Sequence, residues 1–453
     1  AAAPGANPAA ATLGPLTGLV VVEVAGLVSV PYIGALLADL GAEVVKVEGP
    51  QRPDALRHSF GPFLDNDPGT EPWNRSGAFH MLNRGKRSLV CDMKSEPGRL
   101  IFRRLVERAD VLIENFATGV LGKWGLSPQE AVRLNPRLIA LSNTGFGASG
   151  PWAAYKAQGT TLEVTMGAAA YTGYPDGDPL KAGQSYPDYL ACWSGLLAIL
   201  AALAERDRTG RGQWIDQGMY QLGAAVIPEA LLSVQVGQAP PLRRGGEDLD
   251  TFVSGIFATR QDGRWLALSI PDAVAARSLS PLVPALADAG EGCAEQVRSA
   301  LARWLRQQDA DAAEAVLVEV GVAAGRVLTA RDLYGDEHLR QRQFFEPVEV
   351  DPAGQQRRLL IGRPFRFSRD PLAARVRGPA PDFGADNEYV LREIAGFAPD
   401  EVARLLGSPA LTTTPRSFPA VRPIAFADLI EAGRFEAVDE PGPLVATPPG
   451  DGA

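Results

Sequence analysis

The first half of the chain alternates short β-rich runs with helical segments, and this alternation restricts the fold more than any other feature. Runs rich in valine, isoleucine and leucine predict strands at 19–24, 42–48, 88–92, 110–114 and 137–142. Helical segments lie between them, at 31–40, 97–109 and 129–134. Strands and helices in this order are typical of βαβ units, whose parallel strands are covered by helices on both faces. We therefore predict an α/β fold with a mostly parallel sheet.

The ends of these strands indicate where a ligand would bind. Ligands of open parallel sheets bind beyond the carboxyl ends of the strands, which here fall at 25–26, 49–50, 115–116 and 143–146. The first strand end continues as 25–31 and lacks the glycines of a dinucleotide-binding turn. No Gly-x-x-x-x-Gly-Lys-Ser/Thr motif occurs in the sequence. A nicotinamide-dependent dehydrogenase and a P-loop enzyme are therefore disfavoured.

Asp188 stands immediately before the long apolar run 189–204, which predicts a buried helix. A carboxylate at a helix start lies among free backbone N–H groups at the positive end of the helix dipole, which favours its ionised form. Such a group is positioned to act as a nucleophile or a base. Aspartate is also among the commonest N-cap residues, so this local pattern alone favours a cap.

Composition and charge exclude several classes of protein. The 453 residues are 46% hydrophobic and 21% charged, with a net charge of −9 and no basic block, so we expect no nucleic-acid partner. The three cysteines (Cys91, Cys192 and Cys293) are far apart, which argues against a disulfide framework or a zinc site. The three histidines (His58, His80 and His338) lack metal-ligand spacing, and we expect no metal.

The Ala- and Pro-rich stretch 1–14 has no positively charged start, so we do not expect it to be a secretory signal. The apolar run 189–204 is too short for a membrane span and is flanked by Asp188 and Glu205. These features predict a soluble protein of a reducing compartment, and we expect a cytoplasmic location.

The second half of the chain carries different patterns. The Gly-, Pro- and Arg-rich stretch 235–250 predicts a connection, and 254–270 predicts a β-hairpin around Asp262 and Gly263. Helical segments follow to about residue 325, which makes this region a second domain. Beyond residue 406 prolines are frequent, so we expect an extended tail that docks through 425–430.

With these pieces placed, the chain resembles the class III CoA-transferase family, which includes formyl-CoA transferase and carnitine CoA-transferase. The resemblance covers about 16–406, and it is carried by the order and spacing of seven sequence blocks. These blocks lie at 36–48, 82–88, 110–116, 134–139, 145–151, 208–213 and 381–384.

The resemblance implies a Rossmann-like large domain, a smaller α+β domain and a homodimer of interlocked rings, although a heterodimer with a paralogue is an alternative. The expected parts are a flexible N-terminal tail, the first part of the large CoA-binding domain, the small domain with its linkers, a return to the large domain, and a Pro-rich tail. Their boundaries are 1–14, 15–225, 226–345, 346–407 and 408–453.

The resemblance also makes Asp188 a nucleophile, with or without a role as N-cap, because it lies at the family's distance before the Thr-Gly-Arg-Gly block. The implied reaction moves CoA from an acyl-CoA thioester to a carboxylic acid through an aspartyl anhydride and an aspartyl-CoA thioester. Acyl-CoA is then a substrate, and no tightly bound cofactor is expected. Gly245 and Gly246 are candidates for the family's mobile glycine-rich loop, and a plain flexible linker is an equal alternative.

The phosphates of CoA need cations and backbone donors. Matching family positions imply that Lys86, Asn115 and Phe116 contact CoA, and the neighbouring Lys123, Thr144 and Gly145 are further candidates. The family often has arginine at position 49, so Arg52 is expected to substitute for it. Without the resemblance, solvated surface charge is the favoured explanation of Lys86 and Lys123.

Three other activities stay open on the sequence. The family includes intramolecular CoA transfer within a dicarboxylic acid, and a non-catalytic CoA-binding subunit is an alternative of another class. A related α-methylacyl-CoA racemase would need a histidine where Gln158 stands, and glutamine cannot act as a general base. The glutamine that formyl-CoA transferases carry near Val28 is missing, which argues against formate and oxalate as substrates.

Overall fold

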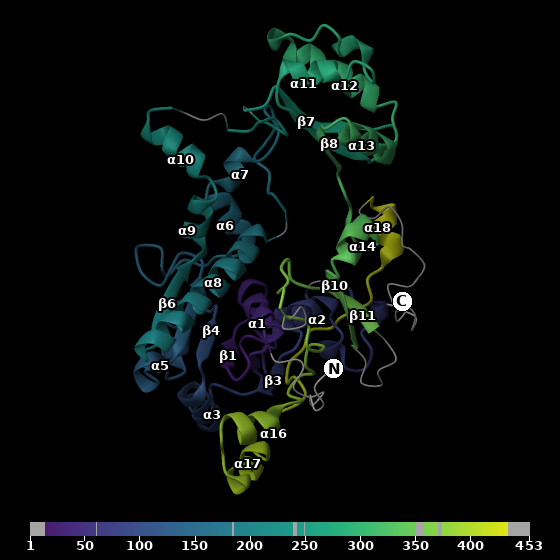
Figure 1. Cartoon of the computed structure of the whole chain (residues 1–453). Coiled ribbons are helices and arrows are strands. Elements are labelled where there is room, and N and C mark those ends of the chain that lie inside the picture. The colour runs from purple at the N-terminus through teal and green to yellow at the C-terminus, as the bar shows by residue number, and fades with distance from the viewer. Residues whose placement is uncertain are drawn as a thin grey trace, which may run out of the picture. The chain divides into compact units, whose positions relative to one another are not determined.

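The computed structural model describes residues 14–59, 61–183, 185–238, 242–248, 250–349, 357–369 and 374–433. The described chain forms two compact units (Figure 1). The larger unit takes its residues from 1–166, 183–226 and 341–453, and the smaller unit consists of 167–182 and 227–340.

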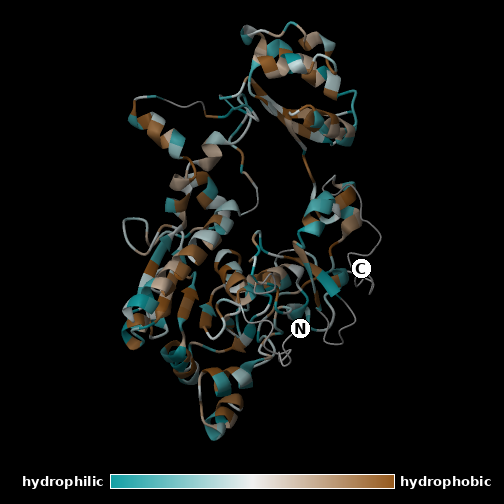
Figure 2. Ribbon diagram, in the orientation of Figure 1, coloured by the Kyte–Doolittle hydropathy of each residue, from teal (hydrophilic) through white to brown (hydrophobic). Residues whose placement is uncertain are grey.

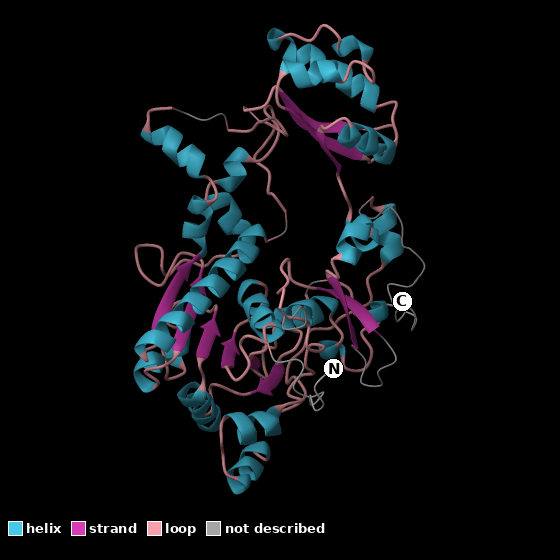
Figure 3. Ribbon diagram, viewed as in Figure 1, coloured by secondary structure: helices cyan, strands magenta, loops and turns pink. Residues whose placement is uncertain are grey.

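The larger unit is built on a six-stranded sheet in which every neighbouring pair of strands is parallel. The strand order is β3-β2-β1-β4-β5-β6, which is the order of a Rossmann-type sheet. Figure 3 draws the strands in magenta. The strands are β1 Val20–Val24, β2 Glu43–Glu48, β3 Arg87–Val90, β4 Val111–Glu114, β5 Ile139–Thr144 and β6 Gln213–Gly218. The predicted α/β fold is confirmed, and the strand order reverses between β1 and β4.

Alternate strand residues enter two cores, one on each face of the sheet, and hydrophobic residues concentrate along these strands (Figure 2). Val21 and Val44 join the core beneath α1 Ser29–Asp39, α2 Gly77–Asn83 and α8 Tyr186–Thr209. Val22 and Val45 join the opposite core. That core is covered by α3 Glu96–Arg108, α5 Pro128–Leu134, α16 Asn387–Tyr389, the π-helix Val390–Ile394 and α17 Pro399–Leu406.

Helix α8 is, among the described residues, the one helix long and apolar enough to cross a membrane. Half of its most apolar stretch is buried within the protein, where Cys192, Leu196 and Ile199 enter the core against α1. The helix ends at Gly210, whose φ of 76° favours glycine. A core helix of a globular protein meets the same criteria of length and hydropathy.

The smaller unit contains an antiparallel sheet of β7 Val253–Ala258, β8 Trp265–Ile270 and β9 Ala323–Arg326. The predicted hairpin around Gly263 is confirmed, because β7 and β8 pair and Gly263 takes a φ of 69°. The other helices of this region are α7 Ala168–Tyr171, α10 Pro228–Gln235, α11 Ala273–Ser278, α12 Ala294–Leu305, α13 Ala310–Glu319, α14 Ala330–Gly335 and α15 Glu337–Gln341.

Residues 167–182 belong to the smaller unit, whereas the sequence places them in the large domain. The reason is local hydrogen bonding: the Gly245 N–H donates to the Gly173 carbonyl at 2.9 Å, and the Arg243 guanidinium donates to the Ala170 and Gly177 carbonyls. Gly245, the expected loop glycine, takes a φ of 62° in this arrangement.

The chain returns to the larger unit through the antiparallel pair β10 Phe345–Glu349 and β11 Arg357–Ile361. The expected extended tail packs onto this unit over much of its described part: Leu411 bridges to Cys91, and the Phe418 ring contacts Trp73 with ring centroids 5.7 Å apart. The expected docking segment forms α18 Phe426–Glu431. Residues 1–13 and 434–453 lie outside the described residues.

Candidate active site

Asp188 is the third residue of α8, after Tyr186 and Pro187. The N-cap of this helix is Ser185, which takes a left-handed φ of 58°, and the Asp188 N–H donates to the Ser185 carbonyl at 3.0 Å. The interpretation of Asp188 as the N-cap is therefore wrong. Its carboxylate faces another helix of the unit instead.

Three helix starts meet at the Asp188 carboxylate. Ser29, the first residue of α1, donates to it from both its backbone N–H and its hydroxyl group. Gly159, the first residue of α6 Gly159–Thr165, lies so close that a Cβ at this position would be 2.2 Å from Asp188 Oδ2. The positive end of the α1 dipole thus faces the carboxylate.

Burial raises the pKa of Asp188 to about 6, and the hydrogen bonds from Ser29 and Ser185 offset this rise in part. The donors at the helix starts favour the ionised form, as expected, but removal from water disfavours the charged form more, so the net shift of the pKa is upward. A carboxylate with this pKa is ionised at neutral pH and is poorly solvated, which suits a nucleophile.

Two amides beneath Ser29 orient its hydroxyl group. Asn143 Nδ2, at the end of β5, donates to Ser29 Oγ at 2.9 Å. Gln217 Nε2, on β6, donates to Asn143 Oδ1 and to the Ala191 carbonyl, both at 2.9 Å. Because Ser29 Oγ accepts from Asn143, its own hydrogen is directed to Asp188. The side chains of Ser29, Asn143 and Gln217 are all buried.

The expected CoA contacts at the ends of β4 and β5 lie on the same carboxyl edge of the sheet. Asn115 exchanges two hydrogen bonds with the Gly26 backbone, at 2.8 and 3.1 Å, and thereby joins the ends of β1 and β4. The Phe116 ring packs edge-on against Trp124. Thr144 Oγ1 is buried without a partner among the described residues, and the Gly145 carbonyl accepts from the Tyr220 N–H. α9 Met219–Ala225 carries Tyr220.

The expected cations have different surroundings. Arg52 is exposed beyond β2, and Lys123 is exposed at the end of α4 Val120–Lys123. Lys86 is buried, and its three N–H groups contact Glu23 Oε2 at 2.7 Å, the Pro31 carbonyl at 2.7 Å and Asn83 Oδ1 at 2.8 Å. All three donors of its ammonium group are thus used within the protein in this structure.

A cavity of about 560 Å³ opens near the amino ends of β2 and β3, lined by residues that include Glu43, Arg87 and Asp386. This is the edge of the sheet opposite to Asp188. Among the described residues, no group of three His, Cys, Asp or Glu side chains could hold a metal ion.

Sequence reasoning did not assign roles to Ser29, Asn143, Gly159 and Gln217. Asn143 belongs to a strand end that the α/β pattern predicts as ligand-binding, so the sequence indicated a site at this position without a role for the side chain. The contact of Ser29 with Asp188 joins residues 159 positions apart, and no local pattern reports it.

Gly159→Ala is expected to lower activity by ~10–100-fold, because Asp188 is the expected nucleophile and small displacements of a reacting group have effects of this size. The new Cβ would meet the end of the Asp188 side chain, so the carboxylate moves more readily than the backbone. Steady-state kinetics measures the effect, and circular dichroism should show an unchanged fold.

Gly335→Ala is the matched control, because a Cβ at this helical position of the smaller unit meets open space among the described residues. Full activity in the Gly159→Ala variant would contradict the close approach of α6 to Asp188.

The sequence profile of CoA-transferase family III matches residues 16–387. The chain is 32% identical to succinyl-CoA–D-citramalate CoA-transferase of Chloroflexus aurantiacus, over 86% of this chain and 96% of the relative. It is also 32% identical to succinate–glutarate CoA-transferase of Agrobacterium fabrum, over 84% and 96%.

A solved structure of similar fold is that of a CaiB/BaiF family protein from Brucella suis, which is 31% identical to this chain. It has a TM-score of 0.75 and covers 84% of this chain and 100% of its own. The chain thus belongs to CoA-transferase family III. It is an enzyme of this class and acts on acyl-CoA.

Proposed function

We propose that Asp188 is the nucleophile of this CoA-transferase and that CoA passes between two carboxylic acids through covalent intermediates on its side chain. The observation that carries the proposal is the meeting of three helix starts at one poorly solvated carboxylate, with two donors from Ser29 on it. A carboxylate nucleophile keeps the acyl group activated throughout, because an anhydride and a thioester replace the original thioester.

Asp188 attacks the carbonyl carbon of the acyl-CoA and the C–S bond breaks. CoA thiolate departs, and a mixed anhydride of Asp188 and the donor acid forms. The thiolate then attacks the aspartyl carbonyl carbon, which releases the donor acid and forms an aspartyl-CoA thioester. The acceptor carboxylate attacks the carbonyl carbon of this thioester, its C–S bond breaks to release CoA thiolate again, and a second anhydride forms. The thiolate attacks the acceptor carbonyl of that anhydride, so the new acyl-CoA forms and the Asp188 carboxylate is regenerated.

Ser29 supplies donors to the oxyanions that form on the aspartyl carbonyl. Its N–H and hydroxyl group already contact the carboxylate, and Asn143 holds the hydroxyl group in place. A preorganised donor of this kind lowers the barrier by about 3 kcal/mol.

CoA lies along the carboxyl edge of the sheet in this proposal. Asn115 and Phe116 follow β4, while Thr144 ends β5 and Gly145 follows it. The exposed cations Arg52 and Lys123 face the phosphates of CoA. The related enzymes act on succinyl-CoA, citramalate, succinate and glutarate by their names, so a dicarboxylic acid is the acceptor class proposed here. The proposed enzyme is a cytoplasmic homodimer.

The test is chemical trapping. Incubation with succinyl-CoA and hydroxylamine should convert Asp188 to a hydroxamate, which mass spectrometry of the α8 peptide detects. Asp207→Asn, on the same helix and exposed, is the matched control and should be trapped as the unaltered enzyme is. Absence of the modification, together with exchange of the α-proton of a branched acyl-CoA in deuterated water, would favour the racemase alternative.

The rate of Asp188 acylation is expected to rise with pH, with a midpoint near pH 6, because only the ionised carboxylate attacks the thioester and its pKa is raised to about 6. Below this midpoint the rate should fall about tenfold per pH unit. Initial rates with succinyl-CoA between pH 5 and 8 measure the profile. A midpoint near pH 4 would contradict the burial of this carboxylate.

A further inference from the structure

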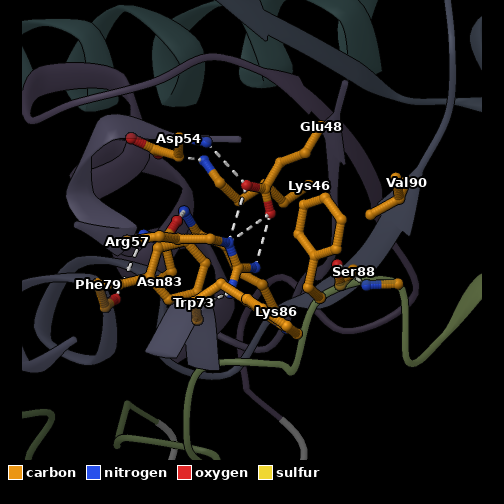
Figure 4. Close-up of polar contacts among 12 residues, drawn as sticks. Lys46, Glu48, Asp54, Arg57, Trp73, Phe79, Asn83, Lys86, Ser88 and Val90 are labelled. Carbon is orange, nitrogen blue, oxygen red and sulfur yellow. Dashed lines mark hydrogen bonds and ion pairs between the residues drawn. The ribbon is translucent and has the colours of Figure 1, made fainter. Parts of the chain in front are cut away.

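Four buried charged side chains lie together beneath the segment that leads from β1 into α1. This charge cluster consists of Glu23 on β1, Lys46 on β2, Asp54 after β2 and Lys86 before β3, and the last three are labelled in Figure 4. Lys46 pairs with Glu23 at 3.0 Å and with Asp54 at 2.8 Å, and Lys86 pairs with Glu23 at 2.7 Å. Two carboxylates balance two ammonium groups, and all four side chains are fully buried.

Buried ion pairs of this kind are weak contributors to stability, because removing the charges from water offsets most of their attraction. The hydrogen bonds that three of these side chains make with the backbone indicate a second role. Lys46 Nζ donates to the Ala25 carbonyl at 3.0 Å, Asp54 Oδ1 accepts from the Leu27 N–H at 2.9 Å, and Lys86 Nζ donates to the Pro31 carbonyl at 2.7 Å. Each of these three side chains therefore holds a backbone group between residues 25 and 31.

Leu27, within this segment, takes a φ of 66°, which side chains with a Cβ adopt rarely. Its own side chain is 41% exposed, so packing does not impose the conformation. The hydrogen bond from its N–H to Asp54 does, together with the Asn115 bonds to Gly26. Two residues later the chain reaches Ser29, whose N–H and hydroxyl group face Asp188.

We propose that Asp54, Lys46 and Lys86 are positioning residues, which fix the segment 25–31 so that the start of α1 presents the Ser29 donors to Asp188. This inference rests on the proposed function and deepens it. Lys86 then acts on catalysis from within the protein, through the Pro31 carbonyl, and not through contact with CoA. Asp54 selects the left-handed conformation at Leu27 that turns the chain into α1.

The variants Asp54→Ala and Lys86→Met are expected to lower kcat by ~10–100-fold with little change in the KM for succinyl-CoA. Asp54→Asn retains an oxygen acceptor for the Leu27 N–H and should recover most of the lost rate. The Ser29 donors lower the pKa of Asp188, so their displacement should also move the pH midpoint of acylation upward. A role in stability alone would leave this midpoint and the kcat of the folded fraction unchanged.

Three results distinguish the proposals. Asp188→Asn, measured in parallel, must be inactive, because retained CoA transfer would overturn the proposed function itself. The positioning role alone is overturned if Asp188→Asn is inactive while Lys86→Met and Asp54→Ala fold and keep the kcat and the pH midpoint of the unaltered enzyme. A raised KM with unchanged kcat in Lys86→Met would also overturn it, because that result indicates a CoA contact. Should Asp54→Ala fail to fold, Lys86→Met decides, since Lys46 keeps Glu23 as its partner in that variant.

Discussion

Asp188→Asn is expected to lower the rate of CoA transfer by at least roughly 1,000-fold, because loss of a covalent nucleophile has effects of this size or larger. Asparagine keeps the shape of the side chain and can still accept from the Ser29 N–H, but its amide oxygen is a poor nucleophile. Because asparagine has the same size as aspartate, it should fit the partly buried position beside Ser29 and leave the rest of the site in place. Initial rates with succinyl-CoA and a panel of dicarboxylic acids measure the loss.

The same substitution is expected to raise Tm. The pKa of Asp188 is about 6 in the folded protein, above the ordinary value of 3.8, so the fold disfavours the ionised form. A difference of this size corresponds to at most about 3 kcal/mol of destabilisation at neutral pH. The uncharged asparagine removes this penalty, as is common where function requires a strained site.

The sign of the linkage provides the control. When folding raises the pKa of a carboxylate, the folded protein loses stability as the pH rises from about 4 to 6, and the ionised group stays destabilising above that range. The gain in Tm from Asp188→Asn should therefore be largest at pH 8 and should shrink as the pH falls below 6. Asp207→Asn, exposed on the same helix, should change neither activity nor Tm.

Arg57→Met is expected to destabilise the larger unit by about 3–5 kcal/mol, because it leaves the Glu48 carboxylate buried without its partner. The Arg57 guanidinium donates to both Glu48 oxygens, at 2.7 and 2.9 Å, and to the Trp73 carbonyl at 2.8 Å (Figure 4). It also stacks on the Phe79 ring, 3.7 Å from the centroid. Thermal and denaturant unfolding, followed by circular dichroism, measure the loss.

The pH dependence of this loss has the opposite sign to that of Asp188. Although burial raises the pKa of Glu48, the Arg57 charge and hydrogen bonds outweigh burial, so the net shift is downward. The pair therefore stabilises the fold above the ordinary pKa of a glutamate, and this contribution is lost as the pH falls through the lowered value. The difference in Tm between the variant and the unaltered protein should narrow in acid.

The double variant Arg57→Met with Glu48→Gln tests the cause of that destabilisation. It should be more stable than Arg57→Met alone, because it leaves no buried charge without a partner. Arg208→Ala, which removes an exposed ion pair with Glu205, should leave Tm unchanged. A wild-type Tm for Arg57→Met would refute the importance of this buried pair.

The α/β fold could be predicted because its signals are local. The expected strands 19–24 and 137–142 are short runs rich in valine, leucine and isoleucine, and the observed parallel strands Val20–Val24 and Ile139–Thr144 lie close to those bounds. The motif spacing around Asp188 similarly identified one carboxylate among many, and placed it at the start of α8.

The partners of that carboxylate could not be predicted. Ser29 reaches Asp188 only because α1 and α8 pack on the same face of the sheet, and the family pattern that implied a CoA contact at Lys86 carries no information about its burial. Pairing between residues far apart in sequence leaves no local periodicity, so neither Asn143 nor Gln217 was expected to support Ser29.

The amino-acid sequence by itself determined the order of strands and helices, the family and the position of the candidate nucleophile, because these depend on spacing along the chain. Tertiary structure decided that Ser185 caps α8, that Lys86 is enclosed, and that the pKa of Asp188 is raised to about 6. These three properties depend on which groups exclude water from a side chain and donate hydrogen bonds to it, and such neighbours are brought together only by packing.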